Sequence, residues 1–103
     1  MNKNNSYTEK EIINGIITEN NDVLLYIYKN SFRPVRHLIT TNSGNEEDAR
    51  DIFQEALIIL YKKLKSNNLK LYCSVCTFIY SIARLLWLKE LKIRGKEVTG
   101  YND

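Results

Sequence analysis

The spacing of apolar residues between a few clear breaks is the feature that most limits how this chain can fold. Its 103 residues include one proline and four glycines, so long stretches contain nothing that would interrupt a helix. Apolar side chains recur in these stretches at intervals of three and four residues, which is the period of an amphipathic helix. No convincing pair of alternating strands accompanies them. The pattern therefore predicts an all-α fold, a compact bundle of about four helices.

The first two helices are marked by their capping residues. Thr8 and Glu11 have the spacing of a capping box, in which each side chain bonds to the backbone N–H of the other residue. The helical pattern that follows stops near residues 20–21. Asp22 is placed to cap the second helix. Pro34 lies within the second pattern, and we expect it to kink or break that helix.

The third and fourth helices are separated from their neighbours by polar turns. The segment TNSGN at residues 41–45 is the clearest turn, and the three acidic residues after it suit the first turn of a helix. This third helix should run to about Lys65. The fourth is expected from about Ser74 to Arg94, with Gly95 as its C-cap.

A chain of this length is expected to form one domain with its own hydrophobic core, burying roughly two-thirds of its surface. We expect an N-terminal capping helix at residues 1–21, a helical domain at 22–96 and the start of a linker at 97–103. No window approaches the roughly 18 consecutive apolar residues of a membrane span. The N-terminus carries no apolar signal segment, so we expect a soluble protein of the cytoplasm.

Charge is distributed unevenly along the chain. Residues 1–60 contain six Lys/Arg and nine Asp/Glu, which gives −3, whereas residues 61–103 contain nine and three, which gives +6. A basic segment interleaved with aromatic residues favours a nucleic-acid partner, because phosphate contacts depend on such clusters.

No set of residues for catalysis or metal binding is apparent. Cys73 and Cys76 form a CxxC pair, but the second pair that a zinc site needs is missing, and the one histidine, His37, is remote in sequence. We expect two reduced thiols packed at a helix entry, with no metal and no cofactor. No Gly-rich phosphate loop occurs, so we expect no enzyme activity.

The fourth helix has two apolar faces when its residues are placed at 100° per step. The face expected to pack inward contains Val75, Phe78, Ile79, Ile82, Leu86 and Ile93. The opposite face contains Tyr80, Arg84, Trp87, Leu88 and Leu91, with Arg94 nearby. An aromatic and arginine stripe suits stacking on unpaired bases, and burying Arg84 without a partner would be costly. A helix through the bundle centre would instead bury both faces, and spacing alone leaves both interpretations open.

The third helix also carries apolar residues outside the face that forms the core. The core face contains Ala49, Ile52, Phe53, Ala56, Leu57, Leu60 and Leu64. Opposite it lie Asp51, Gln54, Ile58 and Tyr61, with Glu55 alongside. A solvated polar face is the simplest interpretation, but Ile58 and Tyr61 do not suit it, which favours contact with a partner helix.

Two sequence blocks resemble a known family. Residues 47–57 are EDARDIFQEAL, and residues 78–84, about two dozen positions later, are FIYSIAR. In this order and separation they resemble the second conserved region of bacterial sigma-70 factors, of the compact extracytoplasmic-function (ECF) type. The resemblance covers about residues 22–96, and the segment 24–36 resembles the opening of the family pattern.

The chain departs from the family pattern at a few places. Phe78 replaces the usual tryptophan, and Leu85 replaces an asparagine that follows the Ile-Ala-Arg triplet. The second change removes a polar group that the family uses in promoter contact. ECF factors also have a C-terminal helix-turn-helix domain, and we expect that domain to be absent here.

The resemblance implies a transcription initiation factor domain that binds core RNA polymerase at the clamp helices of its largest subunit. It also implies recognition and melting of the promoter minus-ten element through the non-template strand, and an anti-sigma factor as a further partner. The residues expected to bind polymerase are Asp51, Gln54, Glu55 and Ile58. The residues expected to bind DNA, in the loop at 66–73 and on the fourth helix, are Asn67, Asn68, Tyr72, Tyr80, Arg84, Trp87, Lys89, Lys92, Arg94 and Lys96.

Two rival functions remain at this point. One is a sigma-like protein-interaction module that binds polymerase or an anti-sigma regulator without melting a promoter. The other is a generic binder of double-stranded DNA. The burial of Trp87 bears on the choice, because truncating a buried tryptophan costs about 3–5 kcal/mol and truncating an exposed one well under about 1.

Overall fold

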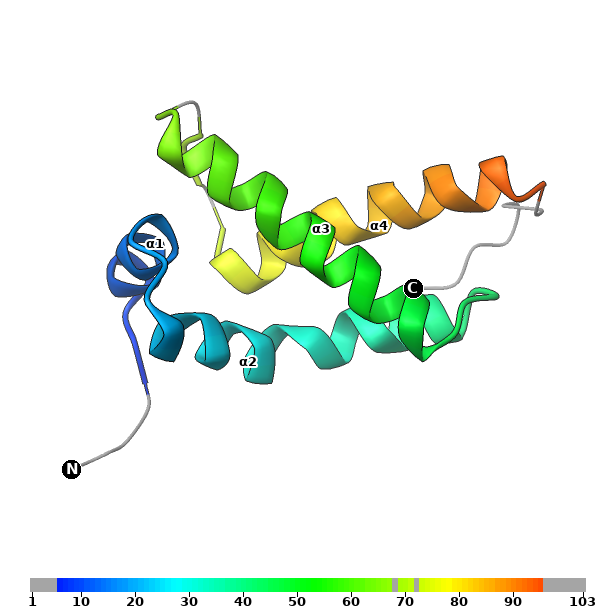
Figure 1. Cartoon of the computed structure of the whole chain (residues 1–103), viewed down its shortest axis with the longest axis horizontal. Helices are drawn as coiled ribbons and strands as arrows, with labels where there is room; N and C mark the ends of the chain where they lie inside the picture. The colour runs from blue at the N-terminus through cyan, green and yellow to red at the C-terminus, as the bar shows by residue number, and fades with distance from the viewer. Residues whose placement is uncertain (1–5, 68, 72, 96–103) are drawn as a thin grey trace.

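The computed structural model describes residues 6–67, 69–71 and 73–95, in which four helices pack around one core (Figure 1). The helices are α1 (Glu9–Ile17), α2 (Asn21–Thr40), α3 (Glu46–Lys65) and α4 (Val75–Ile93). These described ranges contain no strand, so the predicted all-α bundle is confirmed. None of the helices in them is long and apolar enough to cross a bilayer.

Local capping sets where the first two helices begin. The amide of Glu11 donates to the Thr8 hydroxyl at 3.1 Å, and the Glu11 carboxylate accepts from the Thr8 amide at 2.8 Å. The predicted capping box is therefore confirmed. The cap of α2 is Asn20, whose side-chain oxygen accepts from the amides of Asp22 and Val23. The prediction of Asp22 as this cap is wrong, because Asp22 already lies in the first turn, where the helix dipole favours an acidic residue.

Pro34 lies inside α2 without ending the helix, so of the kink or break that was predicted, the break is wrong. A proline lacks the N–H that would bond to the carbonyl four residues earlier, here that of Asn30. Both residues are exposed, so water can bond to that carbonyl. On the other side of the helix, Phe32 and Val35 are buried in the core. Their burial holds α2 together across the missing hydrogen bond.

The core lies where α3 and α4 cross above α2. The first turns of α3 lie beside the last turns of α4, and the loop that joins the two helices lies at the opposite end (Figure 1). From α1, Ile12 and Ile16 are buried in the same core cluster. The N-terminal helix therefore packs as part of the bundle, and it borders one of the surfaces described below.

The buried stripe of α4 differs from the predicted one. Its buried residues are Val75, Ile79, Ala83, Trp87 and Leu91. Trp87 is 0% exposed, whereas Ile93, which was expected in the core, is 69% exposed. The stripe is centred on the small residue Ala83, which allows α4 to lie close to both α2 and α3. Of the two interpretations that spacing left open, burial of both faces is therefore the one that holds for Trp87 and Leu91.

Candidate functional site

The face of α3 that was predicted from the sequence lies at the surface. Asp51, Gln54 and Glu55 are exposed, and Ile58 is 45% exposed. The buried residues of α3 lie on the opposite side and include Ala49, Ile52, Phe53, Ala56, Leu60 and Leu64. Ile58 is thus a large apolar side chain in contact with water beside three polar neighbours. Single exposed apolar side chains are common, whereas a contiguous apolar patch marks an interaction surface, so the role of Ile58 depends on the residues beside it.

A groove that the sequence did not predict adjoins this face. It has a volume of about 330 Å³ and is lined by residues of α1, α2, α3 and the turn between the first two helices. The lining residues are Ile16, Glu19, Leu24, Leu57, Ile58, Tyr61 and Lys62. The Tyr61 hydroxyl donates to the Glu19 carboxylate at 3.1 Å and so ties α3 to the turn after α1. The groove depends on how α1 packs against α3, which helical periodicity does not specify.

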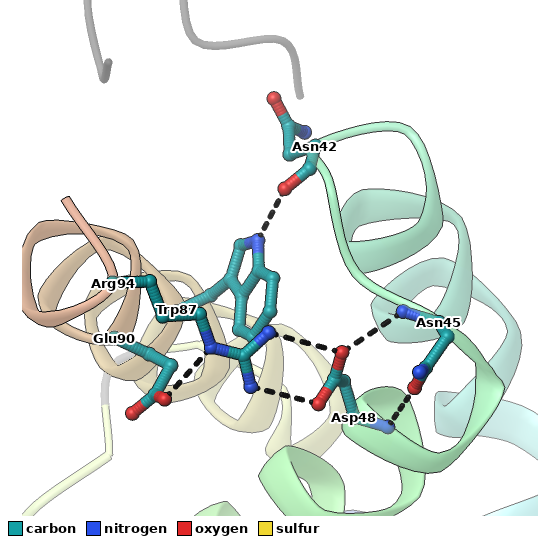
Figure 2. Close-up of polar contacts among 6 residues, drawn as sticks. All are labelled: Asn42, Asn45, Asp48, Trp87, Glu90 and Arg94. Carbon is teal, nitrogen blue, oxygen red and sulfur yellow. Dashed lines mark hydrogen bonds and ion pairs between the residues drawn. The ribbon is translucent and has the colours of Figure 1, made fainter. Parts of the chain in front are cut away.

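Trp87 belongs to the core and not to a DNA-binding face. Its indole N–H donates to the carbonyl of Asn42 at 2.9 Å (Figure 2). The turn passes so close to the ring that a Cβ added at Gly44 would lie 2.3 Å from Ile39 Cγ2 and 2.7 Å from Trp87 Cζ2. The prediction that Trp87 covers an exposed base is therefore wrong. Its indole group instead fixes the turn between α2 and α3.

Arg94, at the end of α4, is held by carboxylates from two helices (Figure 2). It donates to Asp48 through Nη2 at 2.9 Å and through Nη1 at 3.3 Å, and to Glu90 through Nε at 2.9 Å. Its guanidinium carbon also lies 5.0 Å from the centroid of the Trp87 ring, a distance that allows a cation–π contact.

These contacts change the acid–base behaviour of both partners. Hydrogen bonding to Arg94 lowers the pKa of Asp48, although partial burial acts in the opposite direction. Hydrogen bonds to Asp48 and Glu90 raise the pKa of Arg94 above its ordinary value. Since two carboxylates already neutralise Arg94, the structure gives it the role of fastening α4 to α3. The predicted role of Arg94 in holding DNA is not supported.

The other residues predicted to bind DNA have varied positions. Tyr80 and Arg84 are half-buried on α4, whereas Lys89 and Lys92 are exposed near its C-terminal end. Asn67 is exposed in the loop, with its backbone in the left-handed region (φ 61°). Asn68, Tyr72 and Lys96 lie outside the described residues.

The two cysteines differ in their surroundings. Cys76 is half-buried at the start of α4 and accepts a hydrogen bond from the Ser31 hydroxyl, while Cys73 is exposed. His37 lies with Cys76 and Tyr80 along a second groove, of about 360 Å³. In the described part of the chain, no group of three potential metal ligands comes together. We predict that protein purified without added metal contains no stoichiometric zinc. One equivalent by elemental analysis, lost in Cys76→Ser, would contradict this.

A group of lysines lies outside the residues predicted to bind DNA. The end of α3 and the following loop contain four exposed lysines, Lys62, Lys63, Lys65 and Lys70. The signal that could have found them is the absence of any Asp or Glu between Glu55 and Glu90 in the sequence.

Comparison with known proteins gives one informative result for this chain. The family model described as Sigma-70 region 2 matches residues 27–97, which is more than half of the 103 residues. The match includes the whole of α3 and α4 and most of α2. No curated protein and no solved structure matches the chain significantly.

Proposed function

Since the chain belongs to the sigma-70 region 2 family and has a sigma-factor-like role in transcription initiation, we propose that it works as an ECF-like domain with two contact surfaces. The outer face of α3 binds core RNA polymerase at the clamp helices of the largest subunit. The loop at 66–73 and α4 recognise the minus-ten element and hold its non-template strand open.

The exposure of Ile58 is the observation that carries the polymerase contact. It lies in the middle of the outer face of α3, with Gln54 one turn before it and the groove beside it. Burying an apolar side chain at the centre of an interface supplies much of the binding energy, while polar neighbours such as Asp51 and Glu55 set orientation. Asp51, Gln54 and Glu55 belong to the block at 47–57 that resembles the family pattern, and Ile58 directly follows it.

Replacement of Gln54 and Ile58 by alanine tests this contact. The double variant should fold as the natural chain does, because both side chains are exposed and such changes usually alter stability by less than about 0.5 kcal/mol each. Its affinity for core polymerase should fall by at least about tenfold, which corresponds to about 1.4 kcal/mol. Affinity can be measured by fluorescence anisotropy of the labelled chain with core enzyme.

Ile93→Ala is the matched control for this experiment. Ile93 is also an exposed isoleucine, 69% exposed, but it belongs to α4 and does not line the groove beside Ile58. We expect this variant to bind polymerase as the natural chain does. Equal affinity of the Gln54/Ile58 double variant and the natural chain would refute the proposed polymerase contact.

The DNA contact rests on fewer residues than the sequence suggested. Tyr80 and Arg84 lie next to each other on α4 at a spacing of one helical turn, and a ring and a guanidinium group can both stack on bases. Lys89 and Lys92 extend positive charge along the same helix, where they can contact phosphates of the still-paired upstream DNA. Asn67 supplies an amide that can both donate to and accept from a base edge.

One observation favours the rival function, a domain that binds polymerase or a regulator without melting DNA. Of the residues first assigned to DNA, Trp87 is buried in the core and Arg94, at the surface, is bonded to Asp48 and Glu90 of the same chain. Permanganate footprinting of the minus-ten region separates the two functions. We expect polymerase with the natural chain to make thymines reactive, and Tyr80→Ala to lose this reactivity while it still binds polymerase. Polymerase binding without any thymine reactivity in the natural chain would establish the rival.

A further inference from the structure

The helix α1 lies before the part of the chain that matches the family model, which begins at residue 27. It nevertheless lies beside the connection between α3 and α4, at the left of Figure 1. Burial of Ile12 and Ile16 in the core fixes its position. Polar side chains at its first residue and in the turn after it contact the two helices that this connection joins.

Glu9, the first residue of α1, makes one of these contacts. Its carboxylate accepts a hydrogen bond at 2.9 Å from the amide of Val75, a residue 66 positions away that begins α4. The first amides of a helix have no acceptor within that helix, and the helix dipole favours a negative charge beside them. Ser74 accepts from the Thr77 amide of the same turn. Glu9 therefore completes a cap that the local sequence supplies only in part.

Glu19, in the turn after α1, makes the other contact by accepting from the Tyr61 hydroxyl of α3. The turn has the two hydrogen bonds of a Schellman motif, from Glu19 to Ile16 and from Asn20 to Gly15. The backbone of Glu19 is in the left-handed region (φ 55°), where glycine is the usual residue. Backbone conformation alone thus favours glycine here, and the bond to Tyr61 gives the glutamate side chain a role.

The two contacts lie on either side of the loop at 66–73. Tyr61 precedes this loop and Val75 follows it. Between them, Leu69 and Leu71 pack against the core. A groove of about 400 Å³ separates α1 from the loop, and its lining residues are Glu9, Ile13, Leu71, Cys73 and Ser74. The N-terminal segment therefore holds both flanks of the loop and forms one wall beside it.

From these contacts we infer that Glu9 and Glu19 are positioning residues that set the shape of the α3–α4 connection before DNA binds. The inference rests on the proposed function, in which the loop and α4 hold the non-template strand. Ordering a segment during binding costs free energy, and a segment that is already held avoids part of that cost. On this inference, α1 favours promoter opening without contacting DNA or polymerase through Glu9.

Glu9→Ala tests this role in the 103-residue chain. The exchange rate of the Val75 amide, followed by NMR, should rise at least about tenfold, because a hydrogen bond to a charged acceptor is lost. Permanganate reactivity of the minus-ten thymines, measured with core polymerase saturated by each variant, should fall. Affinity for polymerase should not change, because the outer face of α3 is intact. Glu9→Gln keeps an oxygen that can accept from Val75 and should retain both amide protection and thymine reactivity.

Two further variants separate positioning from general stability. Glu47→Ala is the matched control, because Glu47 is an exposed acidic residue in the first turn of another helix, α3. It loses the same kind of dipole interaction and should keep full thymine reactivity. Glu19→Gly relieves the left-handed backbone, so its Tm should not fall, yet its thymine reactivity should.

The outcomes distinguish this inference from the proposed function. If Glu9→Ala and Glu19→Gly keep full thymine reactivity, the inference is wrong and the proposed function stands. Unchanged exchange of the Val75 amide in Glu9→Ala would also overturn the inference, because the carboxylate would then not hold the start of α4. If polymerase with the natural chain gives no thymine reactivity, the inference and the proposed DNA contact are both wrong.

Discussion

The two ends of α3 differ in the contacts that their charged side chains make. At its start, Asp48 is bonded to Arg94, which also lies over the ring of Trp87, and that ring is covered by the turn at Gly44. At its end, exposed lysines lead into a loop and no carboxylate of the described residues pairs with them. Both ends bury apolar residues in the core, Ala49 at the start and Leu60 and Leu64 at the end, so the two ends differ in the ion pairing of their surface charges and not in whether they are packed.

The largest effect on the packed end is expected from Trp87→Ala. This change removes a fully buried indole and its hydrogen bond to Asn42, and such truncations cost about 3–5 kcal/mol. Urea unfolding followed by circular dichroism measures the loss. Leu85→Ala, at a residue that is 66% exposed on the same helix, should cost less than about 1 kcal/mol. A Trp87→Ala cost as small as that of the control would mean that the indole is not part of the core.

Gly44→Ala is expected to lower the free energy of unfolding somewhat less than Trp87→Ala does. The added methyl group would lie within 3 Å of Ile39 and of the Trp87 ring, and overpacking of this kind costs about 1–3 kcal/mol. Thermal unfolding should show a lower Tm. If the ring causes part of the clash, the cost of Gly44→Ala should be smaller in a Trp87→Ala background than in the natural chain. Additive costs in this double-mutant cycle would show that Ile39 alone causes the clash.

Asp48→Asn should have a moderate effect that depends on pH. Pairing with Arg94 lowers the pKa of Asp48 below its ordinary value of 3.8, so the stabilisation is fully present above that value and is lost as pH falls through the lower folded pKa. At neutral pH, Asp48→Asn should lower the free energy of unfolding by about 1 kcal/mol, which is at the upper end of the range for a surface ion pair. In acid the variant and the natural chain should converge.

Unfolding by urea at neutral pH and at pH values below the folded pKa of Asp48 checks this prediction. Asp51→Asn is the control, because Asp51 is exposed on the same helix and forms no ion pair within the described ranges. A difference between Asp48→Asn and the natural chain that persists unchanged in acid would show that the ion pair is not its source.

The smallest effect on stability is expected at the open end of α3. Lys63→Gln/Lys65→Gln should lower the free energy of unfolding by less than about 1 kcal/mol, because only the weak interaction with the helix dipole is lost. The same urea experiment measures it. A loss as large as that of Trp87→Ala would mean that the Lys63 and Lys65 side chains are themselves part of the packing, and the contrast between the two ends would disappear.

Much of the fold was determined by local sequence. Helix positions follow from apolar periodicity, the capping box at Thr8 and Glu11 follows from their spacing, and the turn at 41–45 follows from its composition. The outer face of α3 was also predictable, because one face of that helix is apolar enough to form the core by itself. These features depend on residues that are neighbours along the chain or along one helix.

Only the tertiary structure decided which side of α4 is buried and which groups Trp87 and Arg94 contact. Both sides of α4 are apolar, so periodicity cannot select one; the choice depends on how α2 and α3, which both contact α4, pack against it. Trp87 bonds to a turn 45 residues away, and Arg94 pairs with a carboxylate 46 residues away. Such contacts follow from where the helices cross, because only packing brings residues so distant in sequence within reach of one another.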